Sequence, residues 1–596
     1  MSVVNLRGFK ETSIELGDGL TLLVGPNNSG KTSFLRLLNW LFNEARIETL
    51  GGEVPITDDE SDLLLPARPT RNQARRLTLE VEISDRRTLR RYAQNGENAE
   101  LRMTAWANGE VRLNVGPPRR GEANNDRNRD LAMTLLRELR DSTAFTLIPA
   151  SRDAASENFH EALRAAAVAK LEKQALHTRR GRAPAQSTRI RRAVDEVREI
   201  SAELVAPLWE EMTEAIPPGL AQSAQLGPDI DARHLVGWLA DRTVLRLVTG
   251  DHDELGVGAV EVGSGLQSLL ELAINRAGGS EGVDWILAIE EPEAFLHPSA
   301  QRTLARLLRP AEGSRLIVST HSPLLVDEAR FGEVVLVRNH HFYEPRPVSE
   351  ERRAEINSAL LTGYGAEMAF ASSLLLVEGD ADRLFFERLR RRLAADGAGQ
   401  GLDRLYVLPV GGKTGFGQWL NLVRSFGEVG NRPIRYFVVA DDDGAMDVRR
   451  GFLDAGLTVG SKTTSLLQRV SKAIADKDDP EEVRKAVAAV NRQARRPLRF
   501  QLLAGELETA ALRQASDETC ASLAASFGGG APTERSALIA WLRNKRHKGT
   551  WMRALIGDRL PWTELDRSVA GVMTAWMEGH KEAIANLKRL RDGESI

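Results

Sequence analysis

The sequence predicts an α/β protein in which a nucleotide-binding head, interrupted by a helical insert, is followed by a second, Rossmann-like domain. Three observations support this fold class. A phosphate-binding loop lies between a strand and a helix near the N-terminus, residues 154–240 are mainly helical in pattern, and buried strands after residue 372 end in acidic clusters. The 596 residues suggest about three or four domains. An apolar share of 42% is enough to give them cores.

The overall composition excludes several classes of protein. A net charge of −3, from 80 Lys+Arg and 83 Asp+Glu, excludes a uniformly basic nucleic-acid coat but leaves room for a local basic groove. Cys520 is the single cysteine, so an internal disulfide and a cysteine metal cluster are excluded, and a reducing cytoplasm is the natural compartment. No apolar run is long enough to span a bilayer, and residues 1–24 look like strands rather than a signal segment. We expect a cytoplasmic protein without a membrane partner.

The segment from Gly25 to Thr32 has the G-x-x-x-x-G-K-[ST] spacing of a phosphate-binding loop. An expected strand, Leu20–Val24, precedes it, and an expected helix, Ser33–Phe42, follows it. Its glycines let backbone N–H groups turn toward phosphate oxygens at the positive end of the helix. Lys31 is expected to reach the β/γ-phosphates, and Thr32 to bind Mg²⁺. The residues predicted to bind the nucleotide here are Asn28, Gly30, Lys31, Thr32 and Ser33.

Alternating apolar residues predict an antiparallel sheet beside this nucleotide core. The alternation covers Leu77–Ile83 and then Leu101–Met103 with Val111–Val115, which fold back around an Asn-Gly turn. The charged segment Pro117–Asp130 is predicted to be a loop, and Phe145–Ile148 a buried strand.

Residues from about 154 to 215 have a helical pattern that is broken once, at a basic segment around residues 178–184. A helix over residues 154–177 would be only ~36 Å long, too short for a long coiled-coil arm. The helical segment after that break, which would pair with this helix, carries an apolar stripe along one face. Packing within the insert and a contact between two copies of the chain both explain that stripe.

Further nucleotide motifs come more than two hundred residues later. The expected strand Trp285–Ile289 ends in Glu290, which can hold Mg²⁺ through water, and Glu291, which can orient or deprotonate the attacking water. A second strand ends in His321, placed to contact a γ-phosphate, with a structural histidine as the alternative. A weaker signal is a Gly-Ser helix start whose N-terminus could cap the γ-phosphate of a nucleotide bound by another subunit. Its candidate residues are Ser264, Gly265 and Gln267.

Taken together in this order, these segments resemble the ATPase head of the ABC superfamily, and most closely its DNA-repair branch, such as the RecF and SMC heads. The resemblance implies that two heads sandwich ATP, and hence a homodimer or higher homo-oligomer. The chain departs from the transporter pattern at residues 263–267, which replace the usual signature, and at Glu290, where Asp is common.

A second chemical centre follows two buried strands. Leu374–Val377 ends in Glu378, and Tyr436–Ala440 ends in Asp441 and Asp443. Between them in the sequence, a further expected strand, Leu405–Pro409, runs into Val410-Gly411-Gly412. In a parallel sheet these strand ends share the carboxyl edge, where such sheets bind ligands. Gathered carboxylates repel one another unless divalent cations neutralise them, and oxygen ligands select Mg²⁺ or Mn²⁺, with Ca²⁺ as a further candidate.

A strand followed by Glu-Gly and then a strand followed by Asp-x-Asp resembles the Toprim domain of topoisomerases, bacterial primases and several nucleases. That resemblance implies that Glu378, Asp441 and Asp443 hold the metals. An ABC head with a helical insert followed by Toprim resembles the OLD (overcoming lysogenization defect) nucleases, a family that includes the Gabija antiphage ATPase-nuclease subunit. By this likeness Asp382 takes the place of a second acid, four residues after Glu378, while Glu508 and Lys548 complete the metal site. A solvated run of charges is the alternative for the basic cluster that contains Lys548.

The resemblance implies an ATP-controlled, metal-dependent DNA endonuclease in antiphage defence or DNA processing, cutting by a two-metal mechanism with water as nucleophile. The need for a helicase partner stays open. The alternative is a non-catalytic DNA-clamping ATPase of RecF/SMC type. A topoisomerase would need a tyrosine in a recognisable DNA-binding domain, which the sequence does not offer. The predicted catalytic residues are Glu291, His321, Glu378, Asp441, Asp443 and Lys548.

The expected domains are an ATPase N-terminal part (1–153), a helical insert for dimerisation (154–240), an ATPase C-terminal part (241–348), a connector (349–371) and a Toprim domain with a helical C-terminal region (372–596).

Overall fold

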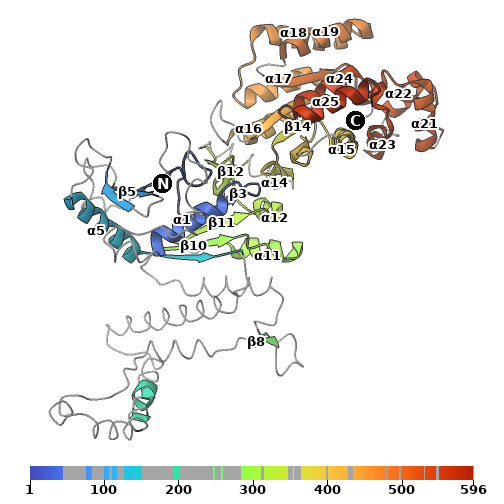
Figure 1. Cartoon of the computed structure of the whole chain (residues 1–596). Coiled ribbons are helices and arrows are strands. Elements are labelled where there is room, and N and C mark those ends of the chain that lie inside the picture. Colours follow the sequence, from blue (N-terminus) through green and yellow to red (C-terminus); the bar gives the residue numbers. More distant parts are fainter. Residues whose placement is uncertain are drawn as a thin grey trace, which may run out of the picture. The chain divides into compact units, whose positions relative to one another are not determined.

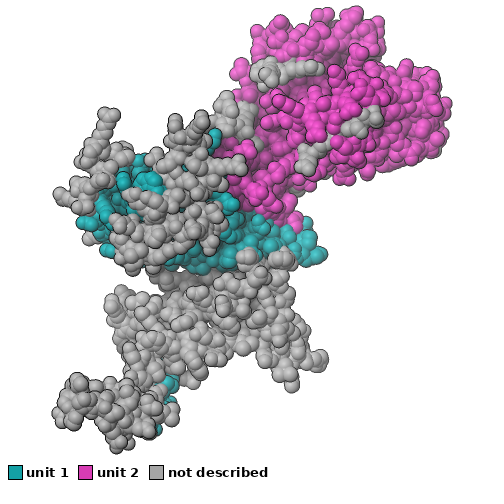
Figure 2. Space-filling view, in the orientation of Figure 1, with its two compact units in different colours: residues 1–21, 32–320 teal, residues 22–31, 321–596 magenta. Residues whose placement is uncertain are grey.

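The structure is a computed structural model of the whole chain. It describes residues 1–43, 76–83, 99–106, 111–116, 126–150, 192–197, 199–200, 203, 246–247, 257–258, 284–294, 296–309, 314–346, 354, 364–397, 401–426, 434–477, 479–494, 498–528, 530–544 and 550–594. These residues belong to two compact units (Figures 1 and 2). The first comprises residues 1–21 and 32–320, and the second residues 22–31 and 321–596. Most of the predicted helical insert lies outside the described residues, so its role in dimerisation stays a prediction.

The first unit contains the predicted antiparallel sheet. Its five strands lie in the order β2-β1-β4-β5-β6, and all neighbouring pairs are antiparallel. The strands are β1 (Ser2–Val4), β2 (Glu11–Ser13), β4 (Arg76–Ile83), β5 (Ala99–Trp106) and β6 (Val111–Val115). Leu79 pairs with Met103, which in turn pairs with Leu113, and all three side chains are buried. The alternation in the sequence therefore predicted the buried face of this sheet correctly.

The charged segment before the next strand differs from the prediction. Helix α5 spans Asp126–Ser142, so the expected loop ends earlier than Asp130. Asn128 explains part of this difference, because its side chain accepts a hydrogen bond from Val115 N at 2.7 Å and ties the first turn of the helix to β6. Buried Leu135 and Leu136 supply the apolar face. Tertiary contacts thus outweigh the weak helix propensity of this Asn- and Asp-containing start.

In addition to the short antiparallel pair of β8 (Arg246–Leu247) and β9 (Val257–Gly258), the first unit contains three parallel strands. They are β7 (Thr143–Ile148), β10 (Asp284–Glu290) and β11 (Ser314–Thr320), with β10 in the middle. Ile286, Ala288 and Ile317 are among their buried residues, as expected for strands covered on both faces. Helix α11 (Pro298–Leu307) follows β10 and begins at His297, whose side chain accepts a hydrogen bond from Ser299 N.

Strand β3 (Gly19–Val24) is divided between the two units, with residues 22–24 in the second. Within the second unit, β12 (Val334–Arg338) runs parallel to β3, and β13 (His341–Tyr343) is antiparallel to β12. Helix α12 (Pro323–Asp327) belongs to the second unit, whereas helix α1 (Lys31–Asn43) belongs to the first apart from its first residue.

The C-terminal part of the second unit is built on a parallel sheet in the order β15-β14-β16-β17. Its strands are β14 (Ser373–Val377), β15 (Leu405–Pro409), β16 (Arg435–Asp441) and β17 (Phe500–Leu503). All five residues of β14 are buried, because the strand lies between two neighbours and both faces are covered. The first three strands match the prediction, whereas β17 was not expected.

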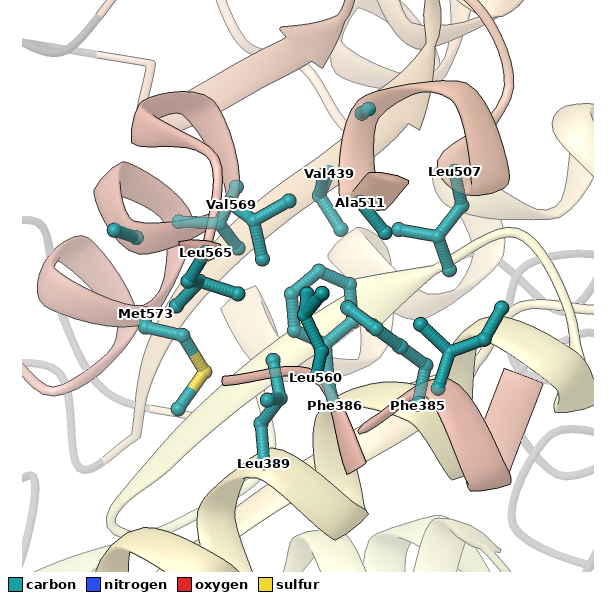
Figure 3. Packing of buried hydrophobic residues seen from close by; sticks show 14 of the residues in the cluster. Phe385, Phe386, Leu389, Val439, Leu507, Ala511, Leu560, Leu565, Val569 and Met573 are labelled. Atoms are coloured by element: carbon teal, nitrogen blue, oxygen red, sulfur yellow. The ribbon is translucent and has the colours of Figure 1, made fainter. Parts of the chain in front are cut away.

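Helices surround this sheet. They are α14 (Tyr364–Met368), α15 (Asp380–Ala395), α16 (Phe416–Arg424), α17 (Ala445–Asp454), α18 (Ser461–Ala475), α19 (Pro480–Ala494), α20 (Leu507–Leu512), α21 (Asp517–Phe527), α22 (Arg535–Arg543), α23 (Thr550–Arg559), α24 (Arg567–Trp576) and α25 (Lys581–Arg591). Figure 3 shows the core between α15, β16 and the C-terminal helices, in which Phe386 and Leu389 pack with Leu560 and Leu565. Each fully buried side chain of this size contributes about 1.5–3 kcal/mol. The helical C-terminal region is therefore part of the same core as the sheet.

Candidate functional site

The phosphate-binding loop lies between β3 and α1, as the sequence predicts. Asn28 has φ 61° and Gly30 φ 106°, the left-handed region in which Asn and Gly are tolerated. A Cβ at Gly25 would come 2.1 Å from the carbonyl oxygen of Val337 in β12, so only glycine fits beside that strand. The spacing of the motif thus reflects both the turn of the loop and a close approach of two strands.

Lys31 is buried and held by several acceptors of the second unit. Its Nζ donates to Gly25 O at 2.8 Å and to Pro26 O at 3.1 Å, and it lies 3.0 Å from His321 Nε2. An ammonium group only donates, so His321 accepts through Nε2 in this contact. The structure therefore brings together two residues that the sequence assigned to the same nucleotide phosphate.

The predicted acid pair lies in the first unit, at the end of β10. Glu290 is buried, and its Oε2 accepts a hydrogen bond from Ala150 N at 3.4 Å, while its Oε1 has no hydrogen-bond partner among the described residues. Burial, more than the neighbouring Glu291, raises the pKa of the Glu290 carboxyl. Such an acid gains from a nearby divalent cation, which offsets the cost of burying its charge.

Glu291 has a left-handed backbone, with φ 43°, and its N–H donates to Ser319 O at 2.9 Å across to β11. A non-glycine residue in this region costs of order 1 kcal/mol and persists where its surroundings fix it. The strain is concentrated at the residue predicted to orient the attacking water. Thr32 and Ser33 lie in the first turn of α1 in the same unit, while Ser264, Gly265 and Gln267 lie outside the described residues.

The second unit contains the acidic centre. Glu378 directly follows β14, Asp441 ends β16, and Asp443 lies two residues further on. One carboxylate oxygen of each lies within 4.8 Å of the other two. Asp441 N donates to Glu378 Oε1 at 3.1 Å, which fixes the glutamate at this edge. A Cβ at Gly444 would lie 2.8 Å from Glu378 Oε1, so a glycine there leaves the space that this carboxylate occupies.

The electrostatics of this trio favour a bound cation. Burial, with added repulsion from Asp382 and Asp443, raises the pKa of Glu378 to about 7. Burial and the charges of Asp382 and Glu378 raise the pKa of Asp441 well above its ordinary value. Hard oxygen ligands clustered without enough positive charge fit Mg²⁺, Mn²⁺ or Ca²⁺, which would restore the ionised state.

Two neighbours of the trio have different roles. Asp442 turns away and accepts a hydrogen bond from Gly505 N at 2.6 Å, so it fixes the turn between β17 and α20. Lys413 follows the Val-Gly-Gly turn and forms an ion pair with Asp443. Burial alone would lower the pKa of Lys413, but the hydrogen bond and charge of Asp443 raise it. The sequence singled out the two glycines and missed the lysine, whose signal was its position directly after them.

The two remaining predicted ligands lie on helices and contact an arginine. Asp382 lies in the first turn of α15 and Glu508 in the first turn of α20. Arg553 of α23 donates to both, at 2.6 Å to Asp382 Oδ1 and at 2.6 and 2.8 Å to Glu508 Oε1. Sequence reasoning missed Arg553, because no local pattern marks it. Lys548 lies outside the described residues.

The head and the acidic centre together define an ATPase joined to a Toprim-type domain. Residues 20–327, more than half of the chain, match the family described as "AAA domain, putative AbiEii toxin, Type IV TA system". Residues 370–443 match the family described as "Overcoming lysogenization defect protein-like, TOPRIM domain". The chain belongs to the first of these families, and with its OLD-like Toprim domain it is an ATPase–Toprim protein.

One curated relative is an OLD nuclease from Thermus scotoductus, 33% identical over 199 residues, which are 31% of this chain and 36% of the relative. The alignment thus spans about a third of that relative's length. Among solved structures, SMC heads match at 12–14% identity. An SMC head bound to the winged-helix domain of ScpA has a TM-score of 0.31 and covers 58% of this chain and 93% of its own.

A second SMC head, bound to the ScpA C-terminal domain from Pyrococcus furiosus, has a TM-score of 0.32 and covers 60% of this chain and 98% of its own. A third SMC head, from Thermotoga maritima, has a TM-score of 0.25 and covers 57% of this chain and 94% of its own. Within the described part of the chain, no helix has both the length and the apolar character needed to cross a membrane.

Proposed function

We propose that this chain is an ATP-controlled, divalent-metal-dependent DNA endonuclease of OLD type, which acts in antiphage defence or DNA processing. The observation that carries the proposal is the convergence of Glu378, Asp441 and Asp443, whose ligand oxygens lie within 4.8 Å of one another at the carboxyl edge of the sheet. The OLD nuclease relative and the Toprim family match support it. The domain boundaries given by the sequence, at residues 153, 240, 348 and 371, are part of the proposal.

The residues of the centre can be assigned to steps of phosphodiester hydrolysis. Glu378 and Asp441 hold the cation, and the hydrogen bond from Asp441 N keeps the Glu378 carboxylate in place. A bound Mg²⁺ or Mn²⁺ would offset developing charge on the phosphate and lower the pKa of its bound water. The side chains of Asp443 and Lys413 are 48% and 36% exposed, so this pair lies on the open side, where a DNA phosphate can approach.

The head is assigned to ATP. Lys31 and Thr32 bind the phosphates and their Mg²⁺, Glu290 holds Mg²⁺ through water, Glu291 orients the attacking water, and His321 contacts the γ-phosphate. Replacing Glu291 with Gln keeps ATP bound and stops hydrolysis. If this variant cuts DNA differently from wild type in the presence of ATP, nucleotide state controls the nuclease.

We also propose a homodimer or higher homo-oligomer, in which the segment with Ser264, Gly265 and Gln267 caps a nucleotide bound by a second copy. DNA is the substrate, and a helicase is a further partner to test by co-purification. Light scattering with and without ATP measures the assembly. A mass of 65.6 kDa in both states would exclude the shared nucleotide site.

The decisive experiment is the incubation of supercoiled plasmid with purified chain and Mg²⁺ or Mn²⁺, with and without ATP. Wild type is expected to nick or linearise the plasmid, and Glu378→Gln is not. Asp403→Asn is a matched control, because its side chain is 97% exposed and its ion pair with Arg390, at 3.9 Å, is a weak one. Asp403 also precedes β15, at the edge of the parallel sheet opposite to the trio. If the plasmid is bound in an ATP-dependent way but never cut, the DNA-clamping alternative replaces the nuclease.

A further inference from the structure

Arg553 gathers two of the five carboxylates that the sequence assigned to metal binding. Its Nη1 lies 2.6 Å from Asp382 Oδ1, and its Nε and Nη2 lie 2.8 and 2.6 Å from Glu508 Oε1. The side chains of Arg553, Asp382 and Glu508 are only 14%, 15% and 2% exposed. Charge-assisted hydrogen bonds of this kind in a buried place are much stronger than surface ion pairs.

The packing of two helices fixes this arginine in place. A Cβ at Gly557 of α23 would come 2.7 Å from Phe385 O of α15, so the two helices touch backbone to backbone. Arg392 of α15 closes the same contact by donating to Gly557 O at 2.9 Å. Arg553 lies one turn before Gly557 on the same face of α23. The close contact therefore carries its guanidinium onto the first turn of α15, where Asp382 lies.

Asp382 and Glu508 are themselves tied to the protein. Asp382 Oδ2 accepts a hydrogen bond from Gly379 N at 3.2 Å, so the acid that holds the arginine also caps the start of α15. Glu508 Oε2 is buried and has no hydrogen-bond partner among the described residues. Burying the charge of the Glu508 carboxylate is costly unless a positive charge lies beside it. The guanidinium of Arg553, bonded to Glu508 Oε1, supplies that charge.

The acidic centre is thus divided in two. Glu378, Asp441 and Asp443 bring one oxygen each to within 4.8 Å of one another and leave room for a cation among them. Asp382 and Glu508, the other two acids that the sequence assigned to this metal site, already converge on a cation that belongs to the chain. A guanidinium stays charged over the whole physiological range, and its planar fork matches carboxylate oxygens.

We propose that Arg553 occupies the place of the second divalent cation, so that this chain binds a single divalent cation at its acidic centre and uses the guanidinium as the fixed second positive charge. The inference rests on the proposed function, since it assumes that Glu378, Asp441 and Asp443 bind a metal. It differs from the two-metal mechanism expected from the sequence. Asp382 and Glu508 become residues that position Arg553 rather than metal ligands.

The experiment is a count of Mn²⁺ bound to the full chain without nucleotide, by isothermal titration and by electron paramagnetic resonance of the free ion. Wild type is expected to bind one Mn²⁺ per chain. Arg553→Ala is expected to bind two, because Asp382 and Glu508 lose their internal cation. Two bound Mn²⁺ in wild type, or a single one in Arg553→Ala that folds like wild type, would overturn the proposal.

A matched control is Arg388→Ala. Arg388 joins the same two helices through an ion pair with Asp558 at 3.4 Å. Its side chain is 44% exposed, and this ion pair involves neither Asp382 nor Glu508. Its Mn²⁺ count should stay at one. Asp382→Asn with Arg553 intact is a second test, which is needed if Arg553→Ala unfolds. One Mn²⁺ should remain, whereas a true two-metal site would lose a ligand and weaken its second ion about 10-fold or more.

The counts separate this inference from the proposed function. If wild type, Arg388→Ala and Arg553→Ala bind no Mn²⁺ at all, the metal-dependent function fails together with the inference. If wild type binds two and Glu378→Gln loses at least one of them, the metal-dependent function stands, and only the assignment of Arg553 is wrong.

Discussion

Lys31 Nζ lies 3.0 Å from His321 Nε2, although 290 residues separate them in the sequence. The lysine starts the helix after the phosphate-binding loop, and the histidine follows strand β11. Nζ also donates to Gly25 O at 2.8 Å and to Pro26 O at 3.1 Å, so these contacts fix the ammonium group in the loop. We propose that a phosphate of ATP replaces these bonds and that His321 then contacts the same phosphate.

We therefore expect Lys31→Ala to weaken ATP binding. A hydrogen bond to a charged group contributes about 1.5–3 kcal/mol, which corresponds to about a 10- to 100-fold rise in Kd. Fluorescent nucleotide titration measures it. Lys10→Ala is a control that removes a lysine with an exposed side chain from the same region. An unchanged Kd in Lys31→Ala would show that the loop does not bind the triphosphate.

Gly444 gives a test of the acidic centre that removes no ligand. Its added Cβ would lie 2.8 Å from Glu378 Oε1, so Gly444→Ala has to push the carboxylate out of place. A displacement of about 1 Å in a catalytic group can cost about 10²-fold in rate. We expect DNA cleavage to fall by about that factor, measured as the initial rate of plasmid nicking.

The control for that variant is Gly460→Ala at the start of α18. A Cβ there has no heavy atom within 4 Å, and neither glycine has a positive φ. The control should cut like wild type. Equal rates in both variants would mean that the position of the Glu378 carboxylate does not matter for cleavage.

The metal-free protein should lose stability as the pH rises. Burial raises the pKa of Glu378 from 4.5 to about 7, so between these values the folded state holds a proton that the unfolded chain has released. The free energy of unfolding then falls with increasing pH and is lowest above pH 7. This group can account for at most about 3 kcal/mol. The raised pKa of Asp441 acts in the same direction.

Melting curves in EDTA at pH 5 and pH 8 measure this dependence. Wild type should lose more Tm than Glu378→Gln, whose amide does not titrate, and Mn²⁺ at pH 8 should restore Tm in wild type only. Parallel curves for the two proteins would mean that Glu378 does not carry the pH dependence.

Much of the site was predictable because its signals are local. A buried strand followed by Glu-Gly and another followed by Asp-x-Asp are each readable from a few residues, and parallel pairing of β14 with β16 necessarily brings their carboxyl ends together. The alternation that predicted β4 and β5 is equally local. For the same reason the phosphate-binding loop and its strand and helix were found within one or two residues.

The missed features depend on contacts between distant segments. Arg553 reaches Asp382 only because Gly557 lets α23 approach α15, and no pattern within residues 550–559 indicates that contact. Strand β17 has four residues and includes the polar Gln501, whose side chain is buried and donates to Ser568 O. Helix α5 starts inside a charged segment because Asn128 bonds to β6. In each case contacts between distant segments determined the local structure, which the secondary-structure propensity of the residues did not predict.

The two chemical centres should respond separately to mutation. Glu378→Ala or Asp441→Ala is expected to lower DNA cleavage by about 10²-fold or more, because each removes a proposed ligand of the cation that would offset charge in the transition state. ATP hydrolysis should stay close to the wild-type rate, since neither residue contacts Lys31, Glu291 or His321 in the described contacts. Plasmid cleavage in Mn²⁺ and phosphate release from ATP, measured on the same preparations, test both expectations.

Asp382→Ala should have a milder effect than either, because Asp382 holds Arg553 at 2.6 Å and is not one of the three converging ligands. Glu508 still binds the guanidinium through two hydrogen bonds in that variant. If Glu378→Ala and Asp441→Ala cut DNA at the wild-type rate, the nuclease centre lies elsewhere. If they fold but also lose ATP hydrolysis, the acidic centre and the head are coupled, and the Toprim domain takes part in the ATPase cycle.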